Sequence, residues 1–174
     1  MWTPKLLMMN GELVPFADAR LHPLSLAVTY ATTVFEGVRA YHVEKTGQFA
    51  LFRLDEHMRR LQVGMKLLRM DRSYDTQYML ESLTKLIRAN EPDSDVYVRL
   101  LVYVEGTGLM ATTGPVGFTA AAMPREKPKF AETGMSLGVS SWHRLDDNAS
   151  PPRIKSTANY HNARLAALQA KSGG

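Results

Sequence analysis

The spacing of apolar residues predicts two amphipathic helices in the first half of the chain. Apolar side chains recur at intervals of four and three over Leu54–Met70, so they gather on one face of a helix. A second apolar series predicts a helix around Met79–Ile87, with Ser73 or Asp75 as its N-terminal cap. The proline within Glu91–Asp93 ends this second helix.

Segments rich in β-branched and aromatic residues predict strands. Asn10 and Gly11 can supply the positive φ angles of a type I′ turn, so the first two strands should form a hairpin. The predicted strands are Leu6–Met9, Glu12–Phe16, Thr33–His42, Gln48–Arg53, Val96–Val104, Phe118–Met123 and Met135–Ser141. Two further helices are predicted, a short one over Ser25–Tyr30 and an alanine-rich one over Asn159–Lys171.

A charged segment with two prolines, Pro124–Thr133, divides the chain into unequal parts and predicts a linker. We therefore expect an α+β domain over residues 1–125, an interdomain linker over residues 126–134, and the beginning of a second domain over residues 135–174. The predicted fold class is α/β, with an antiparallel-rich sheet and two helices in the first domain.

Alternation along Val96–Val104 separates two faces of that strand. Its even positions are all aliphatic, which predicts a buried face, whereas its odd positions place Arg99 between Tyr97 and Tyr103. A cation between tyrosines can bind an anion, or it can simply stack on tyrosine at a solvent face. The pattern leaves both interpretations open.

The strand predicted at Thr33–His42 shows the same alternation. Phe35, Gly37 and Arg39 share one face of it. A glycine inside a strand marks either a close approach by a ligand or another backbone, or a β-bulge. The sequence does not decide between these interpretations of Gly37.

Composition narrows the class of protein. The chain has 174 residues, 45% hydrophobic and 22% charged, with a net charge of +4, which is typical of a globular domain. The chain has no dense cluster of Lys and Arg of the kind that predicts nucleic-acid binding. It also has no apolar run that approaches the roughly 20 residues that span a bilayer. We expect a soluble, cytoplasmic protein.

Cysteine and histidine usage argues against a metal site. The absence of cysteine excludes disulfides, thiolate ligands and cysteine nucleophiles. The five histidines include no H-x-x-x-H pair, and His57 is expected on the surface of its helix. No metal is therefore predicted.

Three basic residues are candidates for binding or catalysis, but local patterns do not assign them. Arg59 and Arg60 both lie off the apolar stripe of their helix, so periodicity cannot choose between them. Lys155 lies between the Pro151–Pro152 bend and the start of a predicted helix, a place where a lysine can be held in position.

Five segments, in order along the chain, resemble motifs of the branched-chain amino acid aminotransferases. These enzymes are class IV aminotransferases that use pyridoxal 5′-phosphate. The segments are Val34–Tyr41 (VFEGVRAY), Phe52–Leu61 (FRLDEHMRRL), Tyr97–Leu100 (YVRL), Ser140–Arg144 (SSWHR) and Lys155–Tyr160 (KSTANY).

The resemblance implies a role for particular residues. Lys155 matches the catalytic lysine that bonds covalently to the cofactor, Arg60 the arginine that holds its phosphate, and Tyr160 the tyrosine near its phenolic oxygen. The positions implied to contact substrate are Phe35, Gly37, Arg39, Tyr97, Arg99 and, reaching the site of a neighbouring subunit, Tyr30.

The activity implied by the resemblance is transamination between branched-chain or similar hydrophobic L-amino acids and 2-oxoglutarate, in a homodimer or higher homo-oligomer. Alternatives are a D-amino acid aminotransferase, an aminodeoxychorismate lyase, or an inactive fragment of such an enzyme. The segment Ala122–Pro128 lacks pocket aromatics that some branched-chain enzymes carry. Family members also continue well past the catalytic lysine, so a truncated second domain is expected.

Overall fold

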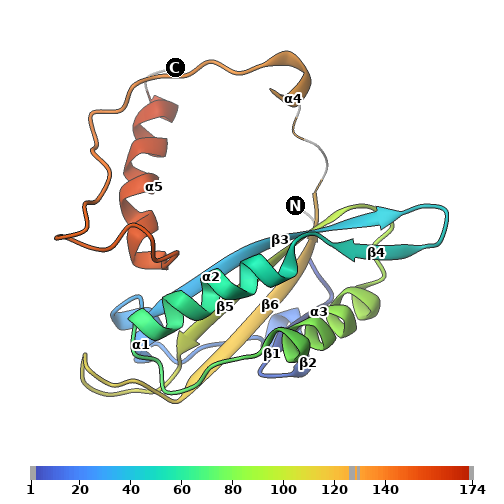
Figure 1. Ribbon diagram of the computed structural model, residues 1–174, viewed down its shortest axis with the longest axis horizontal. Coiled ribbons are helices and arrows are strands. Elements are labelled where there is room, and N and C mark those ends of the chain that lie inside the picture. The colour runs from blue at the N-terminus through green and yellow to red at the C-terminus, as the bar shows by residue number, and fades with distance from the viewer. Residues whose placement is uncertain (1–2, 126–127, 129, 173–174) are drawn as a thin grey trace.

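Strand pairing organises the first 125 residues in the computed structural model, which describes residues 3–125, 128 and 130–172. Within these residues, six antiparallel strands form one sheet in the order β2-β1-β6-β5-β3-β4 (Figure 1). The strands are β1 (Leu6–Met9), β2 (Glu12–Pro15), β3 (Thr33–Val43), β4 (Gln48–Leu51), β5 (Val96–Val104) and β6 (Val116–Pro124). The predicted α/β class and antiparallel sheet are confirmed.

Helices α2 (Leu54–Leu67) and α3 (Thr76–Asn90) cover one face of the sheet (Figure 1). Helix α2 packs on β3, and α3 packs on β1 and β6. The even positions of β5 point into this layer and are buried, as alternation predicts. Apolar side chains from four strands and both helices form the core; among them are Met8, Val34, Val38, Met58, Leu61, Met79, Leu83, Leu86, Val98, Leu100 and Phe118.

Local signals end the elements where the sequence places them. Asn10 and Gly11 have φ angles of 50° and 93°, as the predicted hairpin turn requires. Asp75 caps α3, because its carboxylate accepts a hydrogen bond of 2.7 Å from the Tyr78 amide. Glu91 then ends the helix in the left-handed conformation, directly before the proline.

Beyond β6 the chain no longer adds to the sheet as a strand. It forms a short helix α4 (Phe130–Thr133), an extended segment, and the long helix α5 (Thr157–Ser172), which contacts β3. The strand predicted over Met135–Ser141 is wrong for the residues described, because this segment pairs with no neighbouring backbone there. Its apolar side chains are therefore uncovered, and Leu137 is 87% exposed. Residues 126, 127 and 129 of the predicted linker lie outside the described residues.

The short helix α1 (Leu26–Thr29) packs against β5, near the end of the strand that leads to Gly106. In the part of the chain that the structure describes, no helix combines the length and apolar character needed to cross a membrane.

We predict that Leu83→Ala lowers the free energy of unfolding by about 2–5 kcal/mol, because it leaves a cavity under a side chain that is 0% exposed. Denaturant unfolding followed by circular dichroism measures the change. Leu80→Ala is the matched control on the same helix, where the side chain is 37% exposed and the expected loss is about 1 kcal/mol or less. Equal losses would contradict the assignment of the buried face of α3.

Candidate active site

Strand β3 has an edge that its neighbour covers only in part. Strand β4 pairs with Ala40–Val43 and leaves the preceding residues of β3 without a partner on that side. The segment that carries Lys155 occupies this edge: Ser156 forms a β-bridge with Val34, and the Phe35 amide donates a 3.0 Å hydrogen bond to the Lys155 carbonyl. Lys155 is thus fixed to the sheet from a position about 120 residues further along the chain.

The residues on both sides of Lys155 are buried. Ile154 is 7% exposed and packs into the core beside Val34 and Gly64. A β-carbon on Gly64 would lie 3.0 Å from Val34 Cγ1 and 3.7 Å from Ile154 Cγ2, so glycine lets the three segments pack closely. Since Ser156 is also buried, the backbone of Lys155 is held from both sides.

Asn159 fixes the shape of the loop that leads to Lys155. Its side chain is buried, and its Nδ2 donates hydrogen bonds of 2.9 Å to the carbonyls of Pro151 and Ile154. Its Oδ1 accepts a hydrogen bond of 2.6 Å from the Ser150 hydroxyl. One side chain therefore ties together three points of a loop that has no regular secondary structure.

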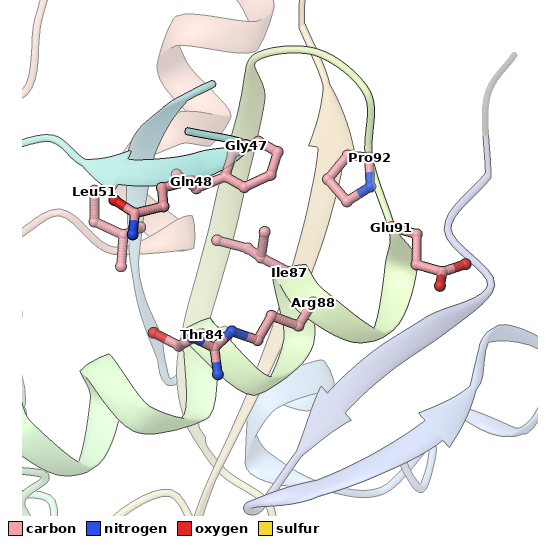
Figure 2. Close-up of a pocket in the computed structure, with 9 residues that line it drawn as sticks. Gly47, Gln48, Leu51, Thr84, Ile87, Arg88, Glu91 and Pro92 are labelled. Atoms are coloured by element: carbon pink, nitrogen blue, oxygen red, sulfur yellow. The ribbon is translucent and has the colours of Figure 1, made fainter. Parts of the chain in front are cut away.

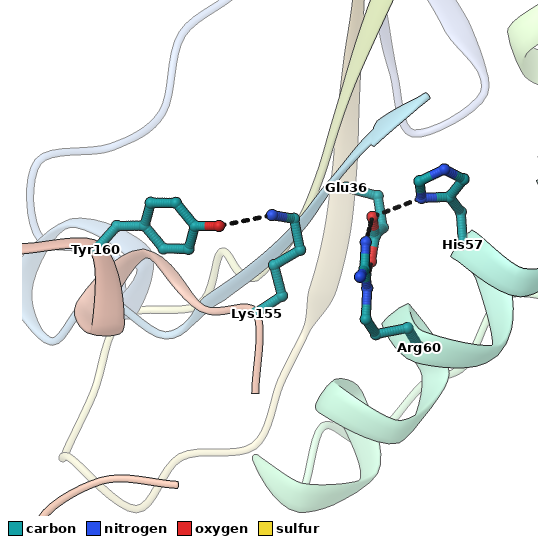
Figure 3. A network of polar contacts seen from close by, with 5 residues as sticks. All are labelled: Glu36, His57, Arg60, Lys155 and Tyr160. Atoms are coloured by element: carbon teal, nitrogen blue, oxygen red, sulfur yellow. Dashed lines mark hydrogen bonds and ion pairs between the residues drawn. The ribbon is translucent and has the colours of Figure 1, made fainter. Parts of the chain in front are cut away.

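The amine of Lys155 faces two aromatic rings. Its Nζ donates a hydrogen bond of 2.7 Å to the Tyr160 hydroxyl (Figure 3). The same Nζ lies 4.5 Å from the centroid of the Phe35 ring. The Phe35 and Tyr160 rings meet edge to face with centroids 4.7 Å apart. The structure brings together these three predicted site residues, and Tyr160 remains 42% exposed, which leaves the group accessible.

A buried carboxylate holds Arg60. Glu36 is 0% exposed, and it accepts hydrogen bonds of 2.6 Å from Nε and 2.7 Å from Nη2 of Arg60 (Figure 3). Its Oε2 also lies 2.8 Å from His57 Nδ1. The expectation that His57 is merely a surface residue is wrong, because its side chain is only 22% exposed and is bound to Glu36.

The charges of this cluster stabilise one another. Burial raises the pKa of Glu36, but the hydrogen bonds from Arg60 and His57 outweigh burial and hold that pKa below its usual value. The hydrogen bond to Glu36 raises the pKa of Arg60 against the opposing effect of burial, and the nearby Tyr160 adds to the rise. Glu36 is therefore a carboxylate, and Arg60 a cation, at neutral pH.

Gly37 lies in a regular ladder opposite Arg99, so it marks no bulge. A β-carbon built on it would lie 2.1 Å from the hydroxyl oxygen of Tyr97. The tyrosine side chain therefore lies over Gly37, a close approach that neither interpretation of the sequence included.

Two further predicted residues are neighbours of Tyr97, since Arg39 lies opposite it in the ladder and Arg99 lies two positions further along β5. Arg39 donates a 2.8 Å hydrogen bond to the Arg125 carbonyl, and the guanidinium carbon of Arg99 lies 5.8 Å from the centroid of the Tyr97 ring. Arginine does stack on tyrosine here, as one of the two interpretations of this face required. Tyr30, which ends α1, is 44% exposed and thus available to a neighbouring molecule.

Comparison with known proteins identifies the family. Residues 33–174 match the family described as amino-transferase class IV. The chain belongs to the class IV aminotransferases. The branched-chain-amino-acid aminotransferase of Salmonella typhimurium is 36% identical over 172 residues, an alignment that covers 95% of this chain and 54% of that protein. This class IV chain thus spans about half the length of the curated relatives it matches.

Solved structures agree with this class IV assignment. The branched-chain amino acid aminotransferase of Thermobaculum terrenum in its PLP form is 33% identical, with a TM-score of 0.83 over 98% of this chain and 56% of that one. The enzyme of Thermoproteus uzoniensis, solved with norvaline, is 28% identical, with a TM-score of 0.89 over 99% of this chain and 58% of that one. The resemblance noted in the sequence is confirmed.

Sequence reasoning missed three residues of this candidate site, namely Glu36, His57 and Asn159. For Glu36 a signal existed, since an even position of β3 places a carboxylate among aliphatic side chains on the core face. His57 lies one helical turn before Arg60 on α2, but this spacing does not indicate a partner. Only the fold brings His57 to Glu36. The role of Asn159 depends on loop carbonyls whose positions no local pattern specifies.

A separate hollow of about 460 Å³ lies between β4 and the C-terminal turn of α3 (Figure 2). Its lining includes Gln48, Leu51, Ile87 and Arg88, but neither Lys155 nor Tyr160. This hollow is therefore separate from the group of residues around Lys155. Among the described residues, no group of three or more His, Cys, Asp or Glu side chains gathers as metal ligands would.

We predict that Asn159→Ala loosens the loop that carries Lys155. Three buried or half-buried hydrogen-bonding groups lose their partner, so the free energy of unfolding should fall by about 1–3 kcal/mol. Hydrogen exchange followed by mass spectrometry should show faster exchange of the Ser156 and Phe35 amides. Asn148→Ala, at an exposed position of the same loop, should leave both amides protected; equal effects of the two variants would refute the anchoring role of Asn159.

Proposed function

We propose that this chain carries the reactive lysine and part of the cofactor site of a pyridoxal-phosphate-dependent aminotransferase. The observation that carries the proposal is the position of the Lys155 amine, 2.7 Å from the Tyr160 hydroxyl at the edge of β3. Family membership and the branched-chain aminotransferases among its relatives support the same conclusion. We further propose residues 1–125 as one domain, residues 126–134 as a linker and residues 135–174 as the start of a second domain.

The residues present suit this cofactor. Lys155 offers an accessible amine for the aldehyde, Tyr160 a hydroxyl for the phenolic oxygen, and Arg60 a guanidinium for the phosphate. When bound, the cofactor withdraws electrons from the substrate α-carbon and so makes its proton removable. No described carboxylate forms a hydrogen bond with Nζ of Lys155, so the amine does not have to leave an ion pair before it reacts.

In the proposed reaction Lys155 acts twice. Its amine first holds the cofactor, and after release it can accept and return a proton as a general base and acid. The Tyr160 hydroxyl limits where Nζ can move, because the tyrosine follows directly on the buried Asn159 at the start of α5. The Phe35 ring supplies an apolar wall at 4.5 Å.

The proposed substrates are branched-chain or similar hydrophobic L-amino acids, with 2-oxoglutarate as the amino acceptor. Phe35 offers contact to an aliphatic side chain, and the guanidinium groups of Arg39 and Arg99 can pair with substrate carboxylates. Gly37 and Tyr97 would shape the same pocket. We also propose a cytoplasmic homodimer or higher homo-oligomer, in which Tyr30 of one subunit reaches the site of another.

A visible absorption spectrum tests the proposal. Addition of pyridoxal 5′-phosphate to the chain should produce a new band from the covalent bond between its aldehyde and the lysine amine. Lys155→Ala should abolish that band, whereas Lys66→Ala, at an exposed position of α2, should leave it unchanged. A band that survives Lys155→Ala would overturn the assignment of Lys155.

The same spectrum distinguishes the alternative activities. L-leucine should deplete the band by converting the cofactor to its amine form, and 2-oxoglutarate should restore it. Depletion by D-leucine but not by L-leucine would favour a D-amino acid enzyme instead. A stable band that no amino acid depletes would exclude both transaminations and leave the lyase and the inactive fragment as alternatives.

A further inference from the structure

The buried cluster of Glu36, His57 and Arg60 has a function that goes beyond holding α2 on the sheet. We propose that Glu36, supported by His57, is a positioning residue that fixes one edge of the Arg60 guanidinium so that its other edge is presented to a phosphate group. This inference rests on the proposed function, because it assumes that Arg60 is the arginine that meets the phosphate.

Glu36 is a rigid anchor. Its backbone lies in the ladder between β3 and β5, opposite Leu100, whose side chain is also 0% exposed. A carboxylate removed from water must be paired and hydrogen-bonded, because leaving it alone is very costly. Glu36 has three such bonds, of 2.6, 2.7 and 2.8 Å, and they leave its side chain little freedom.

The hydrogen-bonding geometry of Arg60 leaves donors available. A guanidinium has five N–H donors in one plane, and the two bonds to Glu36 use Nε and one hydrogen of Nη2. Three donors, on Nη1 and Nη2, then point away from the anchor in the same plane. The side chain is 51% exposed, so a ligand can reach this outer edge. A second bidentate contact, to a phosphate, is therefore compatible with the first.

His57 restrains the anchor from a third direction. It lies one turn before Arg60 on α2 and bonds the same Oε2 that accepts from Arg60 Nη2. Both helical residues thus converge on one carboxylate of the neighbouring strand. The pair of contacts fixes the rotation of Arg60 about its long side chain, which is otherwise free to adopt many rotamers.

Two effects of Glu36 on anion binding have opposite signs. Its negative charge weakens the attraction of Arg60 for a phosphate, whereas its hydrogen bonds remove the entropy loss of ordering the arginine on binding. If charge dominated, removal of Glu36 would strengthen phosphate binding. We expect the orientation effect to dominate, because half of Arg60 is exposed to water, which screens the charge.

Pyridoxine 5′-phosphate and pyridoxine provide the test, since they differ in the phosphate and, lacking an aldehyde, cannot bond to Lys155. We expect the full 174-residue chain to prefer the phosphorylated ligand. Glu36→Gln should reduce that preference about three- to tenfold, the range expected for one long side chain that must be ordered on binding. The affinity for pyridoxine should not change. Isothermal titration measures both dissociation constants.

Glu36→Asp and Glu56→Gln sharpen the test. Glu36→Asp keeps the buried charge but withdraws the anchor by one methylene, so it should also lower the preference if orientation matters. Glu56→Gln is the matched control, because Glu56 pairs with Arg53 on the same helix through an exposed contact of 2.8 Å. It should leave the preference unchanged.

Arginine side-chain NMR of the ligand-free chain reports the orientation directly. The Arg60 Nε–H signal should exchange slowly with water in the unmodified chain and quickly in Glu36→Gln. Equal affinity of the unmodified chain for both ligands would overturn the proposal. So would an unchanged or increased phosphate preference in folded Glu36→Gln and Glu36→Asp. The proposed function fails separately, through absence of the Lys155-dependent absorption band.

Discussion

The pairing of residues 154–156 with the open edge of β3 is the interaction on which the candidate site depends. It joins the Phe35 amide to the Lys155 carbonyl and Val34 to Ser156. Without it, the lysine would lie on a loop with no fixed relation to the sheet. The shortness of β4 makes the contact possible, because a longer strand would occupy the edge that this segment uses.

Because side chains alternate along β3, this strand places site residues on both faces of the sheet. Glu36 points into the helix layer and fixes Arg60, while Phe35 and Gly37 point to the opposite face. One short stretch of backbone thus sets the position of the lysine segment, the arginine and an apolar wall. A buried carboxylate without partners would destabilise the fold. Hydrogen bonds from Arg60 and His57 on α2 offset that cost for Glu36.

Much of the fold follows from local patterns. The sheet strands up to β6 and helices α2 and α3 were predictable because their apolar spacing matches one structural period, and Asp75 adds an explicit cap for α3. The strand expected at Met135–Ser141 shows the limit of such reasoning, since β-propensity indicates a strand only where a partner is available. Gly37 shows another limit, because only the fold reveals that the Tyr97 side chain lies over it.

The site could be predicted only in part. Lys155, Arg60 and Tyr160 came from motif resemblance, and periodicity alone could not separate Arg60 from Arg59. Asn159 and the Glu36–His57 contact depend on groups far apart in sequence or on loop carbonyls, which no period encodes. These residues hold the predicted ones in place. The structure therefore reveals mainly the residues that support the site, whereas the reactive groups were already predicted.

Borohydride trapping tests the central claim most directly, namely that the fold singles out Lys155 as the cofactor lysine. The chain is mixed with pyridoxal 5′-phosphate, reduced, digested and mapped by mass spectrometry. The account predicts a stable modification concentrated on Lys155. Modification spread evenly over exposed lysines such as Lys66 and Lys85, with Lys155 no more labelled than they are, would contradict it.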